Sequence, residues 1–417
     1  MARNIVVLCD GTGNQIGQNI SNVLKLFRCL TTDGDQVAYY DSGVGTLGRL
    51  NPWRRFLDSA ARVWGLMTGA GLDDNVLDAY RFIAETYRDG DRLFLLGFSR
   101  GAYTVRVVAA LIHVVGLLRP EQMNLLGYAL TAFKKTRVTD SIDAAMERAI
   151  AEAIRTEGID TDLDPTRAAD PPEEPLGTYF GRIANARRVP IHFVGVWDTV
   201  SSVLVPRVVP ILPRFEILAN TRNNPSVANF RQAASIDEKR RMFRLDVWLE
   251  GQDFDPSGKE GELAPRQDRK EVWFAGYHSD VGGGHAESES AMAKYPLGWM
   301  ISEAATKGLR FDANEVLHLV GGSPMPGRPY NPYVGPDPGG PIHNSMNPAW
   351  AILEWLPKPL RRRQWPTRRG FLGLYLPRSE PRLIPNGALI HSSAVRRRDS
   401  RIGYEPVNWP ERWEVEG

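Results

Sequence analysis

A serine flanked by small residues is the feature of this sequence that points most directly to chemistry. The pentapeptide Gly-Phe-Ser-Arg-Gly at residues 97–101 lies between an apolar run at 92–96 and a mostly apolar helical pattern at 101–118. A strand before the serine and a helix after it are the context of a nucleophile elbow, a tight turn that exposes the hydroxyl. The sequence therefore predicts Ser99 as a nucleophile.

A nucleophilic serine needs a histidine as its base and a carboxylate that orients the histidine. An apolar run at residues 191–197 ends in Asp198, and a run at 271–275 leads to His278 in a glycine-rich turn. In α/β-hydrolases the triad follows the chain order serine, acid, histidine. We therefore favour Ser99, Asp198 and His278 as a triad for acyl transfer.

A second pair remains open as the acid and the base. His391 follows an apolar run near the C-terminus, where the last triad member often lies, and Asp280 would then be its carboxylate partner. The spacing alone does not decide between His278 and His391.

Two turns are candidates for the oxyanion hole. Arg100 begins the helix after the nucleophile, so its backbone amide lies at the positive end of the helix dipole. The first apolar run, residues 5–9, ends in a glycine-rich turn, and hydrolases take a second amide from the loop after an early strand. We expect Gly11 and Thr12 to supply it.

Aspartates at the ends of the apolar runs allow a different chemistry, a metal-dependent phosphoesterase with hard oxygen and nitrogen ligands. Its candidate ligands are Asp10, Asp41, Asp198, His278 and Asp280. This alternative leaves Ser99 without a role. A catalytically silent binding module on the same fold is a further alternative. The favoured acyl-transfer mechanism needs no cofactor and no metal.

Alternating strands and helices must position these residues. Helical patterns at 75–87 and 101–118 lie between short apolar runs that end in polar turns, at residues 5–9, 36–40, 92–96, 191–197 and 271–275. This alternation predicts an α/β-hydrolase-like fold, a mainly parallel sheet with helices on both faces. Ligands of such sheets bind at the carboxyl ends of the strands.

We expect a catalytic domain over residues 1–320, with a helical and loop insertion at about 120–188. Residues 321–417 would be a C-terminal extension packed on the same domain. Within that extension, the segment from Trp350 to Arg369 interleaves tryptophans and leucines with basic residues. Aromatic residues beside a cationic cluster can make peripheral contact with a membrane; the interpretation we favour is that the tryptophans pack on the protein body, because the prolines prevent one long amphipathic helix.

Composition excludes several protein classes. A net charge of +2 over 417 residues argues against a dedicated nucleic-acid binder. The cysteines Cys9 and Cys29 are too few for a disulfide framework or a cysteine-based zinc site. We find neither a secretory signal peptide nor an apolar run near the roughly 18 residues of a membrane helix. We therefore expect a protein made in the cytoplasm, with any export independent of a signal peptide.

Several motifs together resemble one family of α/β-hydrolases, which includes the phospholipase effectors of bacterial type VI secretion. The motifs are GFSRGA at 97–102, VWDTV at 196–200, HSDVGGG at 278–284, DGTGN at 10–14, IHSSAV at 390–395 and YEPVNWP at 404–410. The resemblance implies a triad of Ser99, Asp198 and His278, and carboxylic esters of lipids or phospholipids as substrates. For an effector it also implies a secretion-apparatus or immunity partner.

Overall fold

The centre of the protein is a parallel β-sheet. The computed structural model describes residues 2–11, 19–43, 71–136, 174–200, 204–205, 214–215, 218, 220–258, 263–325, 327, 332–360, 363–365, 369–400 and 403–417. Within these ranges one sheet has eight strands in the order β12-β11-β8-β7-β4-β3-β1-β2, and each neighbouring pair is parallel. The strands are β1 (Asn4–Cys9), β2 (Gln36–Asp41), β3 (Arg92–Phe98), β4 (Ile191–Trp197), β7 (Val227–Ser235), β8 (Asp268–Phe274), β11 (Ala388–His391) and β12 (Trp413–Glu416).

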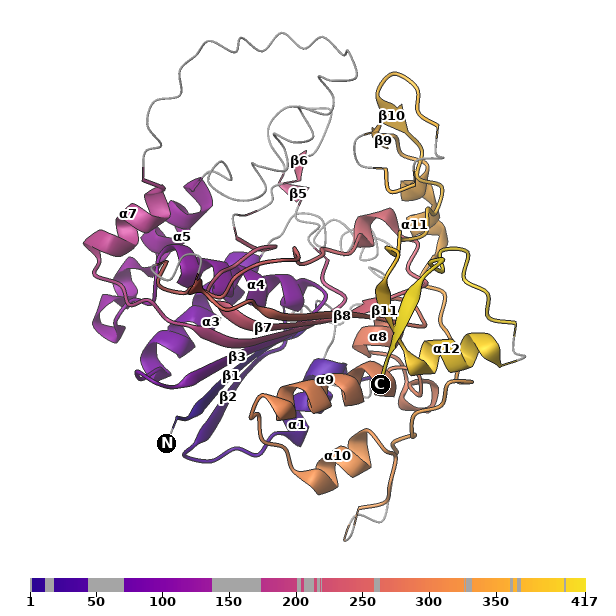
Figure 1. Ribbon diagram of the computed structural model, residues 1–417, viewed down its shortest axis with the longest axis horizontal. Helices are drawn as coiled ribbons and strands as arrows, with labels where there is room; N and C mark the ends of the chain where they lie inside the picture. Colours follow the sequence, from indigo (N-terminus) through magenta and orange to yellow (C-terminus); the bar gives the residue numbers. More distant parts are fainter. Residues whose placement is uncertain are drawn as a thin grey trace, which may run out of the picture.

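Helices cover both faces of the sheet (Figure 1). Alternate side chains of β1 point to opposite faces, with Ile5 and Val7 in one apolar cluster and Val6 and Leu8 in another. The first cluster includes α3 (Leu72–Thr86), α4 (Arg100–Val114) and α5 (Leu126–Lys135). The second includes α1 (Asn22–Cys29), α9 (Lys294–Thr306) and α10 (Ala313–Leu319). The predicted α/β-hydrolase-like class is confirmed.

The remaining described elements are short. They are the helices α7 (Leu176–Ile183), α8 (His278–Gly282), α11 (Pro348–Glu354) and α12 (Ser392–Asp399), the 3-10 turns η2 (Pro120–Leu125), η4 (Arg241–Phe243) and η6 (Glu287–Glu289), and the two-stranded pairs β5 (Leu204–Val205) with β6 (Arg214–Phe215) and β9 (Lys358–Pro359) with β10 (Leu374–Tyr375). None of the helices in the described ranges is long and apolar enough to cross a membrane.

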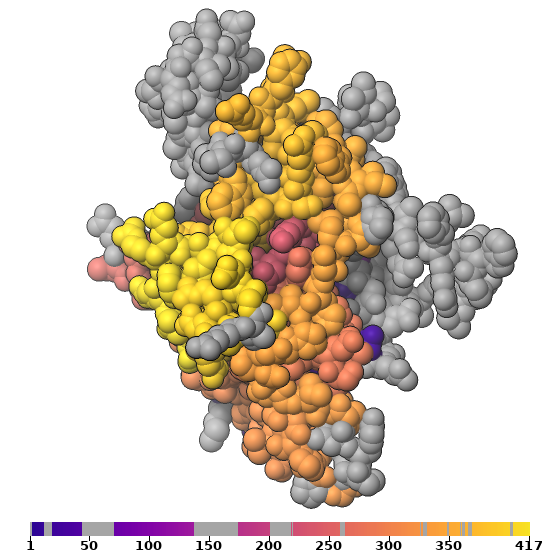
Figure 2. Space-filling model, turned by 90° about the vertical axis from the view of Figure 1, so that its right-hand side faces the viewer, coloured from indigo at the N-terminus to yellow at the C-terminus, as the bar shows by residue number. Residues whose placement is uncertain are grey.

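The C-terminal segment contributes to the main sheet. Strands β11 and β12 extend the sheet beyond β8, and C-terminal residues make up much of the face seen in Figure 2. Of the insertion expected at about 120–188, the structure describes η2, α5 and α7, while residues 137–173 lie outside the described ranges. The division into a domain of 1–320 and an extension of 321–417 stays a prediction.

The strand order creates a switch point beside β3. The chain runs from β1 to β2 on one side and then returns to β3 on the other. Crevices at such points, beyond the carboxyl ends of the strands, are where α/β sheets bind ligands. Ser99, Asp198 and His278 follow β3, β4 and β8, so all three lie at the carboxyl ends of the parallel strands.

The start of α4 packs directly on the end of β1. A Cβ atom added to Gly101 would overlap the carbonyl oxygen of Cys9, which is backbone and cannot turn away. Only glycine therefore fits between the helix and the strand at this point.

We expect Gly101→Ala to lower the free energy of unfolding by roughly 3 kcal/mol, because overpacking displaces backbone. Gly127→Ala in α5 is the matched control, since a Cβ there meets nothing within 4 Å. Alanine in a helix is favoured over glycine by up to about 1 kcal/mol, so the control should be neutral or stabilising. Denaturant unfolding followed by circular dichroism measures both variants; an equal effect of the two would contradict the packing argument.

Candidate active site

Ser99 sits on a strained turn between β3 and α4. Its φ of 58° and ψ of −119° are rare for a residue with a side chain. The turn is held by a hydrogen bond from the Ser99 amide to the Trp197 carbonyl, at 3.0 Å. It also needs small neighbours, because a Cβ on Gly97 would lie 2.5 Å from the carbonyl oxygen of Gly101. The backbone thus has the form of the elbow that the sequence predicts.

The structure brings Ser99, His278 and Asp198 into one hydrogen-bonded chain. Nε2 of His278 lies 2.7 Å from Oγ of Ser99, and Nδ1 lies 2.5 Å from Oδ2 of Asp198. The three residues come from the ends of different strands, yet all are buried. This is the geometry in which a histidine can accept the serine proton while a carboxylate orients the ring.

Asp198 is held by more than the histidine. Its backbone has a φ of 45°, and Oδ1 accepts a hydrogen bond from the Ser235 amide at 2.8 Å. Arg382 donates to both carboxylate oxygens, at 2.5 Å to Oδ1 and 3.0 Å to Oδ2. Burial alone would raise the pKa of Asp198, but Arg382 and His278 hold that pKa well below its ordinary value. Asp198 is therefore ionised at neutral pH.

Two aromatic rings enclose the imidazole of His278. The ring of Phe98 lies 4.6 Å from it and that of Phe243 lies 4.9 Å away, centroid to centroid. Burial lowers the pKa of His278 below its ordinary value, although the hydrogen bond and charge of Asp198 act in the opposite direction. The imidazole is therefore neutral at neutral pH, as a general base must be.

Arg382 was not among the predicted site residues. It lies in a loop between prolines, Pro381 and Pro385, and no local pattern marks it. Its guanidinium is buried and also donates to the carbonyl of Phe243, at 2.5 Å. Arg382 is recognisable as a residue of the candidate site only once the fold has brought it to Asp198.

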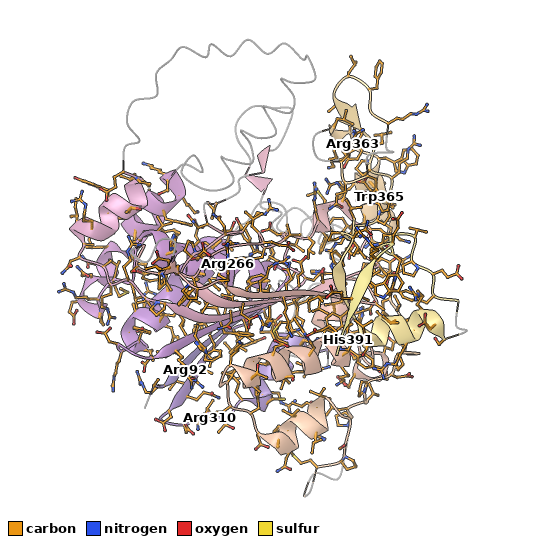
Figure 3. All side chains as sticks on the ribbon, viewed as in Figure 1. Arg92, Arg266, Arg310, Arg363, Trp365 and His391 are labelled. Carbon is orange, nitrogen blue, oxygen red and sulfur yellow. The ribbon has the colours of Figure 1, made fainter. Side chains whose placement is uncertain are left out.

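The alternative pair is not brought together. Asp280 binds His343, with 2.6 Å between Oδ1 and Nδ1. His391, labelled in Figure 3, ends β11 and pairs with Glu416 of β12. Its Nδ1 lies 2.8 Å from Oγ of Ser393, and its ring stacks on Phe274. The hydrogen bonds of the described residues thus join His278, rather than His391, to Ser99.

The oxyanion candidates differ in their surroundings. Arg100 is the first residue of α4 and directly follows Ser99. The amide of Gly11 donates to Oδ1 of Asp10 at 2.7 Å, and Thr12 lies outside the described residues. A role for either residue of the early loop stays a prediction.

The other strand-end aspartates have protein partners. Asp10 accepts hydrogen bonds from the hydroxyls of Ser21 and Tyr40, and Asp41 accepts from the side chain of Asn75. In the described part of the chain, the one group of three or more residues close enough to share a metal ion includes neither aspartate. It contains Asp280 but neither Asp198 nor His278.

The tryptophans of the segment from Trp350 to Arg369 have different environments. Trp350 is buried against Phe243, and Nε1 of Trp365 donates to the carbonyl of Pro381 at 2.7 Å. Trp355 is 59% exposed. Packing on the body thus accounts for two of the three, and membrane contact by the segment stays a prediction.

Comparison with known proteins gives one extended match to a family. The model of the catalytic domain of Tle1-like phospholipase effectors of type VI secretion matches residues 3–303. A curated protein of Saccharomyces cerevisiae, the uncharacterized protein YEL023C, is 25% identical over 400 residues, covering 74% of this chain and 58% of the yeast protein. This chain therefore spans little more than half of that relative.

Similar solved structures are more distant. An uncharacterized protein from Pseudomonas aeruginosa has a TM-score of 0.35 and 17% identity, covering 76% of this chain and 47% of that one. The Tle1 effector bound to the VgrG spike has a TM-score of 0.31 and 17% identity, with coverages of 70% and 53%. The esterase Est2 of Thermogutta terrifontis has a TM-score of 0.30 and 13% identity, with coverages of 74% and 83%.

On the family match, this chain belongs to the Tle1-like phospholipase effector catalytic domains.

Proposed function

We propose that this protein is a serine hydrolase that cleaves carboxylic esters of lipids through an acyl-enzyme on Ser99. The observation that carries the proposal is the hydrogen-bonded chain from Ser99 through His278 to Asp198, with distances of 2.7 and 2.5 Å. Membership in a family of phospholipase effector domains supports an ester hydrolase of the lipase and esterase type.

The proposed mechanism has two halves. His278 takes the proton of Ser99 as Oγ bonds to the ester carbonyl carbon, and the protonated imidazole then gives that proton to the departing alkoxide. In the second half His278 takes a proton from a water molecule as the water oxygen bonds to the acyl carbon, and it then gives that proton to Oγ of Ser99 as the bond from Oγ to the acyl carbon breaks and the acid leaves. The negative charge on the carbonyl oxygen falls at the start of α4, where the Arg100 amide and the helix dipole stabilise it.

The lipid substrate class rests on the family and on the surface near the C-terminal segment. Large apolar side chains are exposed there, including Ile352, Trp355, Phe371 and Leu372. They fit peripheral contact with a lipid surface. The family also supports a secretion-apparatus partner, and an immunity partner belongs to the same effector hypothesis.

Ser99→Ala should abolish labelling by a fluorophosphonate probe and reduce kcat/KM for p-nitrophenyl esters by at least about 10⁴-fold, because no other group can form the acyl-enzyme. Ser393→Ala is the control, since Ser393 binds His391 and lies outside the triad. A series of acyl chain lengths, followed by phospholipid vesicles, separates a lipase from a small-ester enzyme. Turnover that survives in Ser99→Ala, or a wild type that neither reacts with the probe nor hydrolyses any ester, refutes the proposal.

The fall of kcat/KM toward acidic pH should follow the protonation of His278. Because kcat/KM requires the neutral imidazole and burial lowers the pKa of His278, the midpoint should lie below pH 6.5, near which a free histidine titrates. Arg382→Gln leaves Asp198 without its guanidinium, so the carboxylate favours the imidazolium more strongly. We expect the midpoint to move upward by about one pH unit.

Arg378→Gln is the matched control, because Arg378 lies over the exposed ring of Trp355 rather than at the site. Circular dichroism fixes the folded fraction of each variant before the profiles are compared. If Arg382→Gln lowers stability without moving the acid limb, the arginine has a structural role alone.

A further inference from the structure

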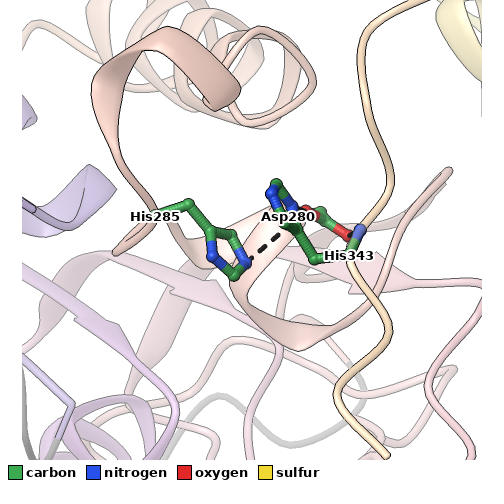
Figure 4. A group of neighbouring side chains, drawn as sticks. All are labelled: Asp280, His285 and His343. Carbon is green, nitrogen blue, oxygen red and sulfur yellow. Dashed lines mark hydrogen bonds and ion pairs between the residues drawn. The ribbon is translucent and has the colours of Figure 1, made fainter.

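A second cluster of ionisable side chains adjoins the helix that carries His278. Asp280 comes from α8, His285 from the loop after it, and His343 from the C-terminal segment (Figure 4). One ligand atom from each residue lies within 4.8 Å of those of the other two. The site proposed above uses none of the three.

The carboxylate of Asp280 is fixed so that one oxygen faces both histidines. Oδ2 accepts hydrogen bonds from the backbone amides of Tyr277 and His343, at 2.9 and 3.0 Å. Oδ1 lies 2.6 Å from Nδ1 of His343 and 3.6 Å from Nε2 of His285. Backbone amides that orient a buried carboxylate are typical outer-shell support for a metal ligand.

His285 points a nitrogen at this cluster without a hydrogen bond to satisfy it. Its Nε2 is buried and makes no hydrogen bond to a described residue, and Oδ1 of Asp280 at 3.6 Å is beyond hydrogen-bond distance. A buried polar nitrogen without a partner costs free energy and calls for an explanation, of which an ion is one. The ring stacks on that of His343 with 3.7 Å between centroids, so the two imidazoles lie side by side at the cluster.

The second nitrogen of His343 also has a partner of the expected kind. Nε2 lies 3.3 Å from Oε2 of Glu289. Metal-ligating histidines commonly donate their other ring N–H to a carboxylate, which fixes the tautomer and leaves the opposite nitrogen for the ion. With Nδ1 turned to Asp280 and Nε2 to Glu289, His343 has this arrangement.

We propose that Asp280, His285 and His343 bind a divalent transition-metal ion of the zinc type. Two imidazoles and one carboxylate are a donor set that suits Zn²⁺, whereas Ca²⁺ and Mg²⁺ prefer oxygen ligands throughout. The ion replaces the proton shared by Asp280 and His343, and that proton leaves to solvent. Water completes the coordination, since both histidine side chains are partly exposed.

The role of this ion is structural. His343 belongs to the C-terminal segment, and Asp280 follows His278 by two residues in the same short helix. A shared ion therefore ties the C-terminal segment to the helix that places the base. The inference does not depend on the proposed ester hydrolysis, and Ser99→Ala should bind the ion as tightly as the wild type.

The test is a metal titration of the full chain after removal of metal by a chelator. We expect one equivalent of Zn²⁺ by calorimetry, a d–d absorption band with Co²⁺, a higher melting temperature with Zn²⁺, and no such effect of Mg²⁺. His285→Gln and His343→Gln should each weaken Zn²⁺ binding at least about 100-fold, and Glu289→Gln about tenfold.

His192→Gln is the matched control. His192 lies near the start of β4, at the opposite end of this strand from Asp198, and its ring nitrogen binds the carbonyl of Lys307. It should bind Zn²⁺ as the wild type does. The proposal is overturned if the wild type takes up no Zn²⁺, or if both His285→Gln and His343→Gln still bind it. The cluster would then be only a hydrogen bond between Asp280 and His343, with the ring of His285 stacked on that of His343. Circular dichroism verifies the fold of each variant. The titration of the wild type tests the proposal even if a variant does not fold.

Discussion

The buried carboxylate of Asp198 is the group on which the rest of this site depends. It has lost all contact with solvent, and the desolvation of a carboxylate costs several kcal/mol unless partners replace water. Here the Ser235 amide, the Arg382 guanidinium and His278 replace it. Because Arg382 neutralises the charge, Asp198 can orient His278 without drawing a proton onto it. The same pairing is compatible with the role of base that we propose for the imidazole.

The backbone around this charge is strained at two neighbouring points. Both Ser99 and Asp198 have positive φ values, of 58° and 45°, a conformation that costs on the order of 1–3 kcal/mol per residue. Each is held by the next strand, since the Ser99 amide bonds to Trp197 and the Asp198 amide to Ala233. The parallel sheet therefore does more than carry the residues. The hydrogen bonding between neighbouring strands continues for one residue past the ends of β3 and β4, and it fixes the turns that carry the side chains of Ser99 and Asp198.

Local sequence patterns predicted the parts of the protein that local physics determines. The apolar runs of β1, β3 and β4 and the Gly-x-Ser-x-Gly turn follow from short-range rules, and Ser99, Asp198 and His278 could be named from their places at strand ends. Strand β7 could not be predicted from such local patterns. It lies in the middle of the sheet but contains Arg231, which is buried because Asp268 and Glu303 bind it at 2.8 and 2.5 Å. Charges in a strand suggest exposure until their distant partners are known.

Arg382 shows the same limit at the site, because its partner is 184 residues away in the chain. It also lies beyond the family match, which ends at residue 303. Trp350, in the same C-terminal region, packs on Phe243, whose ring lies against His278. The C-terminal segment thus supports the proposed base in two ways: Trp350 packs on Phe243, one of the rings that enclose His278, and Arg382 neutralises the Asp198 carboxylate. The C-terminal residues are thus part of the surroundings of the proposed triad.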